Sequence, residues 1–105
     1  MSINPKRPHK WLSGKSVLEK ARKYLNSGNV ISTPHLKKRM EEKHFDMHDV
    51  INIIENGKIL KPPEWNEEFG QFRYVVKGKD VEGVELNIVI TISTKEEILT
   101  IITGF

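Results

Sequence analysis

The feature that constrains the fold most is an alternation of apolar and polar residues in the C-terminal third of the chain. Gln71–Lys77 and Val84–Ser93 both alternate, and Gly78–Gly83 lies between them as a turn region. Because successive side chains of a strand point to opposite faces, this pattern predicts a β-hairpin with one apolar face. That face would carry Phe72, Tyr74, Val76, Val84, Leu86, Ile88, Ile90 and Ile92.

The N-terminal half repeats its apolar residues at helical spacing instead. Ser16, with Glu19 three residues later, forms a capping-box pattern and predicts the start of a first helix. Helix signals of the same kind mark two further helices. The remaining boundaries are Gly28 as the first stop, Thr33-Pro34 as the start of a helix to Lys43, Asp46 as the next N-cap, and Asn56-Gly57 as its end.

The other segments complete an α+β fold. Val30–Ser32 and Lys58–Lys61 are predicted as short extended pieces, and Glu64–Gly70 as a polar loop holding Trp65. Ile98–Phe105 is apolar on both faces, which predicts a central or covered strand. Helices followed by an antiparallel meander predict that the helices pack on one face of the sheet.

Charge is distributed unevenly along the 105 residues, although the net charge is only +3. Residues 1–45 carry eleven Lys and Arg against three Glu, whereas residues 46–105 carry six against eleven Asp and Glu. The basic half predicts a face for an anionic partner, and RNA is the partner we expect; a dipolar, solvated surface is the alternative. Residues 1–15 are expected to form a basic arm, followed by one domain over 16–105.

Composition excludes several kinds of protein. The chain has no cysteine, which excludes disulfides, thiolate metal sites and cysteine nucleophiles. His44 and His48 stand four apart, but Asp46 is expected to break the helix between them, so no metal site is predicted. The N-terminus has no apolar run and no stretch is long enough to cross a bilayer, so we expect a cytoplasmic protein without a membrane partner.

His35 and Arg39 are the sharpest candidates for chemistry. Being four apart on the second predicted helix, they share one helical face. His35 lies at the helix N-terminus, where the dipole favours bound anions, and Arg39 can hold a phosphate through its planar guanidinium. Such a pair can take a proton from a ribose 2′-hydroxyl and stabilise the charge that develops. The alternative is a His that caps or packs beside an Arg bound to a nearby carboxylate.

Further basic and aromatic residues are candidates for RNA contacts. Arg73 and Lys77 share the strand face opposite the apolar one, where Asn87 and Thr91 could join them in holding phosphates. Alternatively, these cations pair with Glu85 across the strand on a solvent face. The other predicted contacts are Trp65, which could stack a base or cover the sheet edge, and Lys6, Arg7, Lys10 and Lys38.

A family resemblance extends over Thr33–Phe105. In order, this stretch carries His35-x-x-x-Arg39-Met40, Asp49-Val50-x-x-x-Ile54, Gly57, Arg73-Tyr74 and Ile101-Ile102-Thr103. The series resembles a family of small bacterial and phage domains of unknown function. That family looks like a branch of the RelE/ParE-type toxin superfamily, with BrnT and MqsR as relatives. Lys23–Val30 also looks like the opening of MqsR-type toxins.

The resemblance implies a RelE-like fold, with N-terminal helices on one face of a curved antiparallel sheet and an active surface opposite. It implies a metal-independent endoribonuclease of a toxin–antitoxin system, which cuts mRNA, often on the ribosome, and is inhibited by a cognate antitoxin. The family positions fall on His35, Arg39, Arg73 and Thr103. No cofactor is expected, because the ribose 2′-hydroxyl supplies the nucleophile. The alternative is a non-catalytic RNA- or protein-binding module of the same fold.

Overall fold

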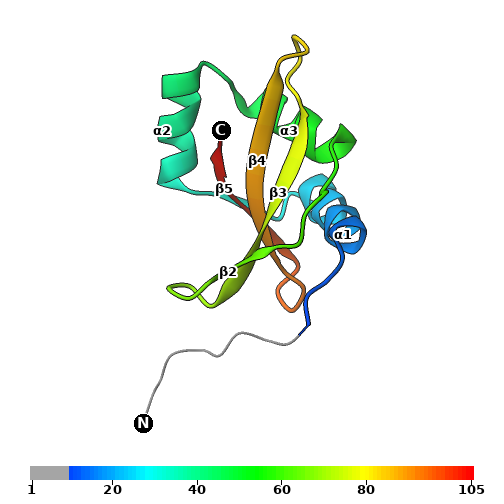
Figure 1. The fold of residues 1–105 in the computed structure, drawn as a ribbon. Coiled ribbons are helices and arrows are strands. Elements are labelled where there is room, and N and C mark those ends of the chain that lie inside the picture. The colour runs from blue at the N-terminus through cyan, green and yellow to red at the C-terminus, as the bar shows by residue number, and fades with distance from the viewer. Residues whose placement is uncertain (1–9) are drawn as a thin grey trace.

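The computed structural model describes residues 10–105 and contains three helices and a five-stranded mixed sheet (Figure 1). Along the chain the elements are α1 (Gly14–Asn26), β1 (Val30–Ser32), α2 (Pro34–Lys43), α3 (Met47–Asn56), β2 (Glu64–Asn66), β3 (Gln71–Lys79), β4 (Glu85–Ser93) and β5 (Ile98–Gly104). The strands lie in the order β1-β5-β4-β3-β2, and the sheet is open at both edges. The predicted α+β class is therefore confirmed.

The first helix begins earlier than the capping-box pattern predicts. Ser13 is the N-cap of α1, and its hydroxyl accepts a hydrogen bond from the backbone N–H of Ser16 at 3.1 Å. The assignment of Ser16 as the cap was wrong, because the helix can extend back to Gly14 once Ser13 supplies the same acceptor. Helical structure thus starts inside the predicted arm, and Lys6 and Arg7 lie outside the described residues.

The predicted bounds of α2 and α3 are confirmed. Thr33 caps α2 and Pro34 occupies its first turn, where a missing N–H costs nothing. The α3 helix starts with a reciprocal capping box between Asp46 and Asp49 and ends before Gly57. These ends were predictable because each depends on contacts between residues three or four positions apart.

The sheet differs from the predicted antiparallel meander at both edges. Val30–Ser32 is the edge strand β1, which runs parallel to β5, so the sheet is mixed rather than purely antiparallel. Lys58–Lys61 forms no strand but a single bridge at Lys58. The predicted loop Glu64–Gly70 contains the short strand β2, which pairs with the start of β3. The pairing of β1 with β5 joins residues far apart in sequence, which local patterning does not encode. The β2 strand pairs with residues close in sequence, but its segment is polar and was predicted as a loop.

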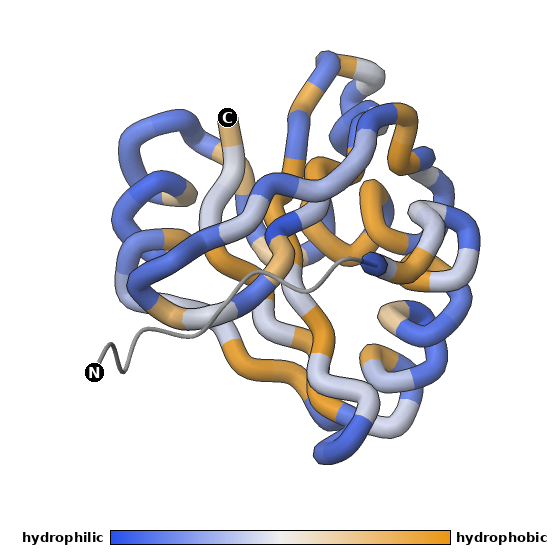
Figure 2. The backbone as a smooth tube through the Cα atoms, turned by 60° about the horizontal axis from the view of Figure 1, so that its bottom comes forward, coloured by the Kyte–Doolittle hydropathy of each residue, from blue (hydrophilic) through white to orange (hydrophobic). Residues whose placement is uncertain are grey.

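The two faces of the sheet are differently covered. Helices α1 and α3 pack on the face that carries Tyr74, Val76 and Ile88, and this layer holds most of the buried apolar core. Figure 2 shows the hydrophobic segments gathered in the interior and hydrophilic ones along the outer turns. The α2 helix lies along β5, beyond the end of β1 (Figure 1). We call the other face the open face; on it lie Arg73, Val75, Lys77, Asn87, Val89, Thr91, Thr100 and Thr103.

Within residues 10–105, none of the helices is long and apolar enough to cross a membrane.

Candidate functional site

A β-bulge in β5 fixes where α2 meets the sheet. Val89 pairs with Thr103 and Ile90 with Ile101, so Ile102 is an extra residue in the ladder. The Ile102 carbonyl accepts a hydrogen bond from the hydroxyl of Thr33 at 2.6 Å, and the same hydroxyl accepts from the N–H of Leu36 at 3.1 Å. One side chain therefore caps α2 and ties its first turn to the residue beside Thr103.

Arg39 extends this connection by one turn of α2. Its Nε donates to the Gly104 carbonyl at 3.1 Å, and its Nη1 lies 4.0 Å from a Glu42 carboxylate oxygen. Arg39 thus caps the unpaired edge of β5, and the predicted alternative of a structural Arg beside a carboxylate holds in part. The Arg39 side chain is still one-quarter exposed, and the guanidinium has further N–H groups with which to bind a ligand.

His35 is exposed on α2, one turn before Arg39 and on the same side of the helix. Because Arg39 reaches the edge of β5, that side of α2 lies at the junction with the sheet. Thr103 lies at the same junction, half-buried on the open face. We call this group the α2–β5 seam: His35, Arg39 and Thr103.

Arg73 lies elsewhere on the open face. It belongs to β3, which is separated from β5 by β4, so about 10 Å of sheet lies between Arg73 and the α2–β5 seam. Its guanidinium carbon stands 5.6 Å from the centroid of the Phe69 ring, a cation–π contact that orients the side chain. The Arg73 Nε is buried and has no hydrogen-bond partner among the described residues. A buried donor of this kind is costly unless a ligand supplies the acceptor.

The end of the open face around Lys77 and Asn87 carries charged, polar and apolar side chains. Lys77 forms an ion pair with Glu85 at 3.7 Å, so the alternative predicted for it, a pair across the strand, is the one the structure shows. Asn87 lies opposite Lys77, and its Oδ1 is buried without a partner among residues 10–105. Lys77, Asn87 and the exposed Phe105 line a hollow of about 280 Å³.

The remaining predicted RNA contacts do not share this face. Trp65 of β2 is paired with Phe72, and the two ring centroids are 4.9 Å apart, which places Trp65 on the helix-covered side. The β2 pairing sets this direction, and the predicted role of Trp65, stacking a base or covering the sheet edge, stays a prediction. Lys10 lines the same hollow as Trp65. Lys38 is exposed on α2.

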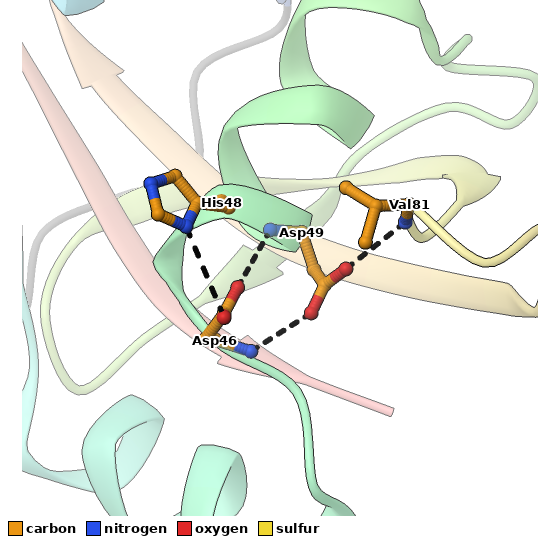
Figure 3. Close-up of polar contacts among 4 residues, drawn as sticks. All are labelled: Asp46, His48, Asp49 and Val81. Atoms are coloured by element: carbon orange, nitrogen blue, oxygen red, sulfur yellow. Dashed lines mark hydrogen bonds and ion pairs between the residues drawn. The ribbon is translucent and has the colours of Figure 1, made fainter.

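An acidic cluster caps α3 without forming a metal centre (Figure 3). The Asp49 carboxylate accepts from the N–H groups of Asp46 at 2.9 Å and Val81 at 3.0 Å. Those bonds, the Val81 bond foremost, hold the pKa of Asp49 below its usual value of 3.8. His48 stands 3.9 Å from Asp46 at the surface. In the described part of the chain, no three His, Asp or Glu side chains gather as metal ligands would.

Comparison with known families identifies the segment that carries the α2–β5 seam and Arg73. Residues 32–103 match a family described as a domain of unknown function, DUF4258. The chain belongs to this family. The match covers more than half of the chain, from the start of α2 through Thr103, so it includes His35, Arg39, Arg73 and Thr103. No curated protein matches the chain. Membership of a family of unknown function is thus confirmed, whereas the link to RelE/ParE-type toxins stays a prediction.

Two elements of the site escaped sequence reasoning. Phe69, which orients Arg73, was predicted only as part of a polar loop. The sequence feature that could have indicated its role is that it is a large aromatic residue directly after two glutamates. Thr33 was recognised as a cap but not as the link to Ile102. That link depends on a bulge 69 residues away in the chain, for which no local pattern exists.

Proposed function

We propose that this protein is a metal-independent endoribonuclease of the RelE-like toxin type, with RNA lying across the open face and against the α2–β5 seam. The observation that carries the proposal is the Arg73 guanidinium, which lies over Phe69 on an uncovered sheet face and has no ion pair among residues 10–105. An arginine held by packing, with its charge unpaired, is suited to a phosphate group. The basic N-terminal half of the chain supplies the long-range attraction for such a polyanion.

The α2–β5 seam would carry the chemistry. His35, exposed at the start of α2, would take the proton of a ribose 2′-hydroxyl or return a proton to the leaving 5′-oxygen. The 2′-oxygen would attack the adjacent phosphorus in line, leaving a 2′,3′-cyclic phosphate. Arg39 would stabilise the charge on the phosphate through the N–H groups that do not bind Gly104. Thr103, the next residue of the seam, would contact the same phosphate through its hydroxyl.

Arg73 has a different part in this proposal from the one the family positions imply. Since it lies two strands from the seam, it would hold a neighbouring phosphate and fix the register of the RNA rather than contact the scissile bond. Lys77, already paired with Glu85, would contribute less. In this proposal the residues of the α2–β5 seam act on the scissile phosphate, and Arg73 on β3 positions the RNA.

The proposed partners follow from the same reaction. RNA, including mRNA on the ribosome, is the substrate, the cytoplasm is the site of action, and a cognate antitoxin protein would keep the enzyme inactive. Expression in bacteria should arrest growth and degrade RNA, and co-expression of the neighbouring gene should relieve both effects. Growth that is unaffected by expression would contradict the toxin assignment.

The deciding experiment compares RNA cleavage by matched histidine variants in excess chelator. His35→Ala should lower the cleavage rate by at least about 100-fold, the range typical of a lost general base. His48→Ala is the control, because His48 is also an exposed helical histidine but lies on α3, away from the seam. Equal cleavage by both variants would remove His35 from the mechanism. RNA binding without cleavage by the wild-type protein would instead support a non-catalytic binding module.

A further inference from the structure

The five-stranded sheet splits at one end. The β3 strand pairs with β2 over Gln71–Arg73 but with β4 only from Tyr74 onward. The last residues of β4, Thr91–Ser93, pair only with β5, whereas Ile88–Ile90 pair with both β3 and β5. The Thr91 hydroxyl donates to the Phe72 carbonyl at 2.7 Å and marks the point where the two strands separate. A wedge therefore opens between the β2–β3 hairpin and the β4–β5 turn.

This wedge joins two hollows, one on each side of the sheet. The hollow on the helix side has a volume of about 300 Å³, and the one on the open side about 400 Å³. Five residues line both hollows: Gly70, Gln71, Thr91, Ile92 and Thr94. We call the joined space the split cleft. Each hollow by itself lies at the lower end of the volume range of small-ligand pockets, which suits one planar group rather than a large ligand.

Aromatic rings line the helix side of the split cleft. The Phe72 centroid lies 4.9 Å from that of Trp65 and 5.8 Å from that of Trp11, with interplanar angles of 63° and 58°. Trp11 is 43% exposed. Gln71 and Thr94 add hydrogen-bonding groups, and Lys10 adds a positive charge. Aromatic faces with polar edges are the chemistry that binds a nucleobase.

The open side of the split cleft leads to the proposed path of the RNA backbone. Phe69 lines that side and also contacts Arg73, which directly follows Phe72 in β3. A strand whose phosphate binds Arg73 can therefore direct one base into the wedge. We propose that the split cleft binds one unpaired nucleobase of single-stranded RNA. This inference rests on the proposed RNA function, and it gives Trp65 and Lys10 a role that the open face does not offer them.

The two tryptophans of the chain both line the split cleft, so intrinsic fluorescence reports on its occupancy. Titration of the full chain with uridine or adenosine 5′-monophosphate should quench this fluorescence, whereas ribose 5-phosphate, which lacks a base, should not. Thr94→Phe fills the cleft from an exposed position and should abolish the quenching, and Thr94→Ala should preserve it. Both variants should unfold at the wild-type urea concentration, because Thr94 is outside the core.

An RNA oligonucleotide and an abasic oligonucleotide of equal length separate this site from the phosphate contacts. The abasic strand should bind roughly tenfold more weakly to the wild-type protein, a difference typical of one stacked base, and the difference should vanish in Thr94→Phe. Equal binding of both strands, with an effect of Arg73→Ala, would overturn the cleft but leave the RNA function standing. Quenching by nucleotides without any oligonucleotide binding would overturn RNA as the ligand.

Discussion

Arg73 is positioned by packing and not by an acidic partner. Its guanidinium lies over Phe69, its Nε is buried without an acceptor, and no ion pair to it occurs among residues 10–105. The side chain therefore keeps both its charge and its hydrogen-bonding capacity for a ligand. Arginines used only for stability normally satisfy their buried donors within the protein.

Arg73→Ala should weaken RNA binding and reduce the slope of log affinity against log salt by about one, because one phosphate contact is lost. Arg73→Lys should restore part of the salt slope but not the full affinity, since the planar fork is missing. Fluorescence anisotropy over a salt series measures both quantities. Lys23→Ala, an exposed α1 cation, is the control. A salt slope unchanged by Arg73→Ala would show that RNA does not contact this residue.

Asp49 carries the pH dependence of stability that the structure allows us to predict. Its carboxylate accepts two backbone N–H bonds and is only 7% exposed, and its pKa is lowered in the folded protein. A lowered pKa contributes stability above the unfolded value and loses it as the pH falls through the folded value. The wild-type free energy of unfolding should therefore decline below about pH 4.

Asp49→Asn should reduce that decline and lower stability at neutral pH by about 1–2 kcal/mol, because the amide cannot accept both bonds. Urea denaturation at pH 3 to 7 measures both effects. Glu55→Gln, an exposed carboxylate on the same helix, is the matched control. An acid dependence that is identical in Asp49→Asn and the wild type would assign the dependence to other groups.

At the scale of elements, the Thr33 hydroxyl both caps α2 and joins it to β5. Thr33→Ala removes both the cap of α2 and the hydrogen bond to Ile102, and should lower the free energy of unfolding by about 1–2 kcal/mol. Thr33→Ser keeps the hydroxyl and should stay within about 0.5 kcal/mol of the wild type. Urea denaturation gives the free energies. If both variants lose the same stability, the methyl group and not the hydroxyl holds the seam.

The sequence predicted those elements whose signals are local. Pro34–Lys43 was predicted to the residue because a cap and a proline mark its start. The alternation that predicted β3 and β4 also placed Arg73 and Lys77 on the face opposite Tyr74, as the register shows. The parallel pairing of β1 and the bulge at Ile102 were not predictable in this way, because each is set by partners distant in sequence. The strand β2 was missed although Asn66 pairs with nearby Gln71, because Glu64–Gly70 is polar.

The same distinction explains what was and was not predictable about the site. The i, i+4 spacing correctly predicted that His35 and Arg39 share one face of a helix. It could not predict the hydrogen bond from Arg39 to Gly104, because Gly104 lies 65 residues away in the chain. The side of the sheet on which Trp65 lies was not predictable, because its strand was predicted as a loop. Residue types thus indicated the chemistry, whereas tertiary pairing decided which residues meet.

For the molecule as a whole, covering one face of the sheet leaves the other for a ligand. Helices α1 and α3 bury the apolar face, and α2 occupies the edge of β5 where a further strand would otherwise pair (Figure 1). The open face and the α2–β5 seam therefore adjoin along β5. An RNA strand that binds Arg73 and reaches His35 must cross β4, and this path links the positioning and the reacting residues of the proposed enzyme.

The most direct test of this account is the chemistry of the cut ends. The purified protein is incubated in excess chelator with an RNA oligonucleotide and with the same oligonucleotide carrying 2′-deoxyriboses throughout. We predict that the RNA is cleaved to products ending in a 2′,3′-cyclic phosphate, seen by mass spectrometry, and that the deoxy strand stays intact. Intact RNA, or cleavage of both strands at the same rate, would contradict the account.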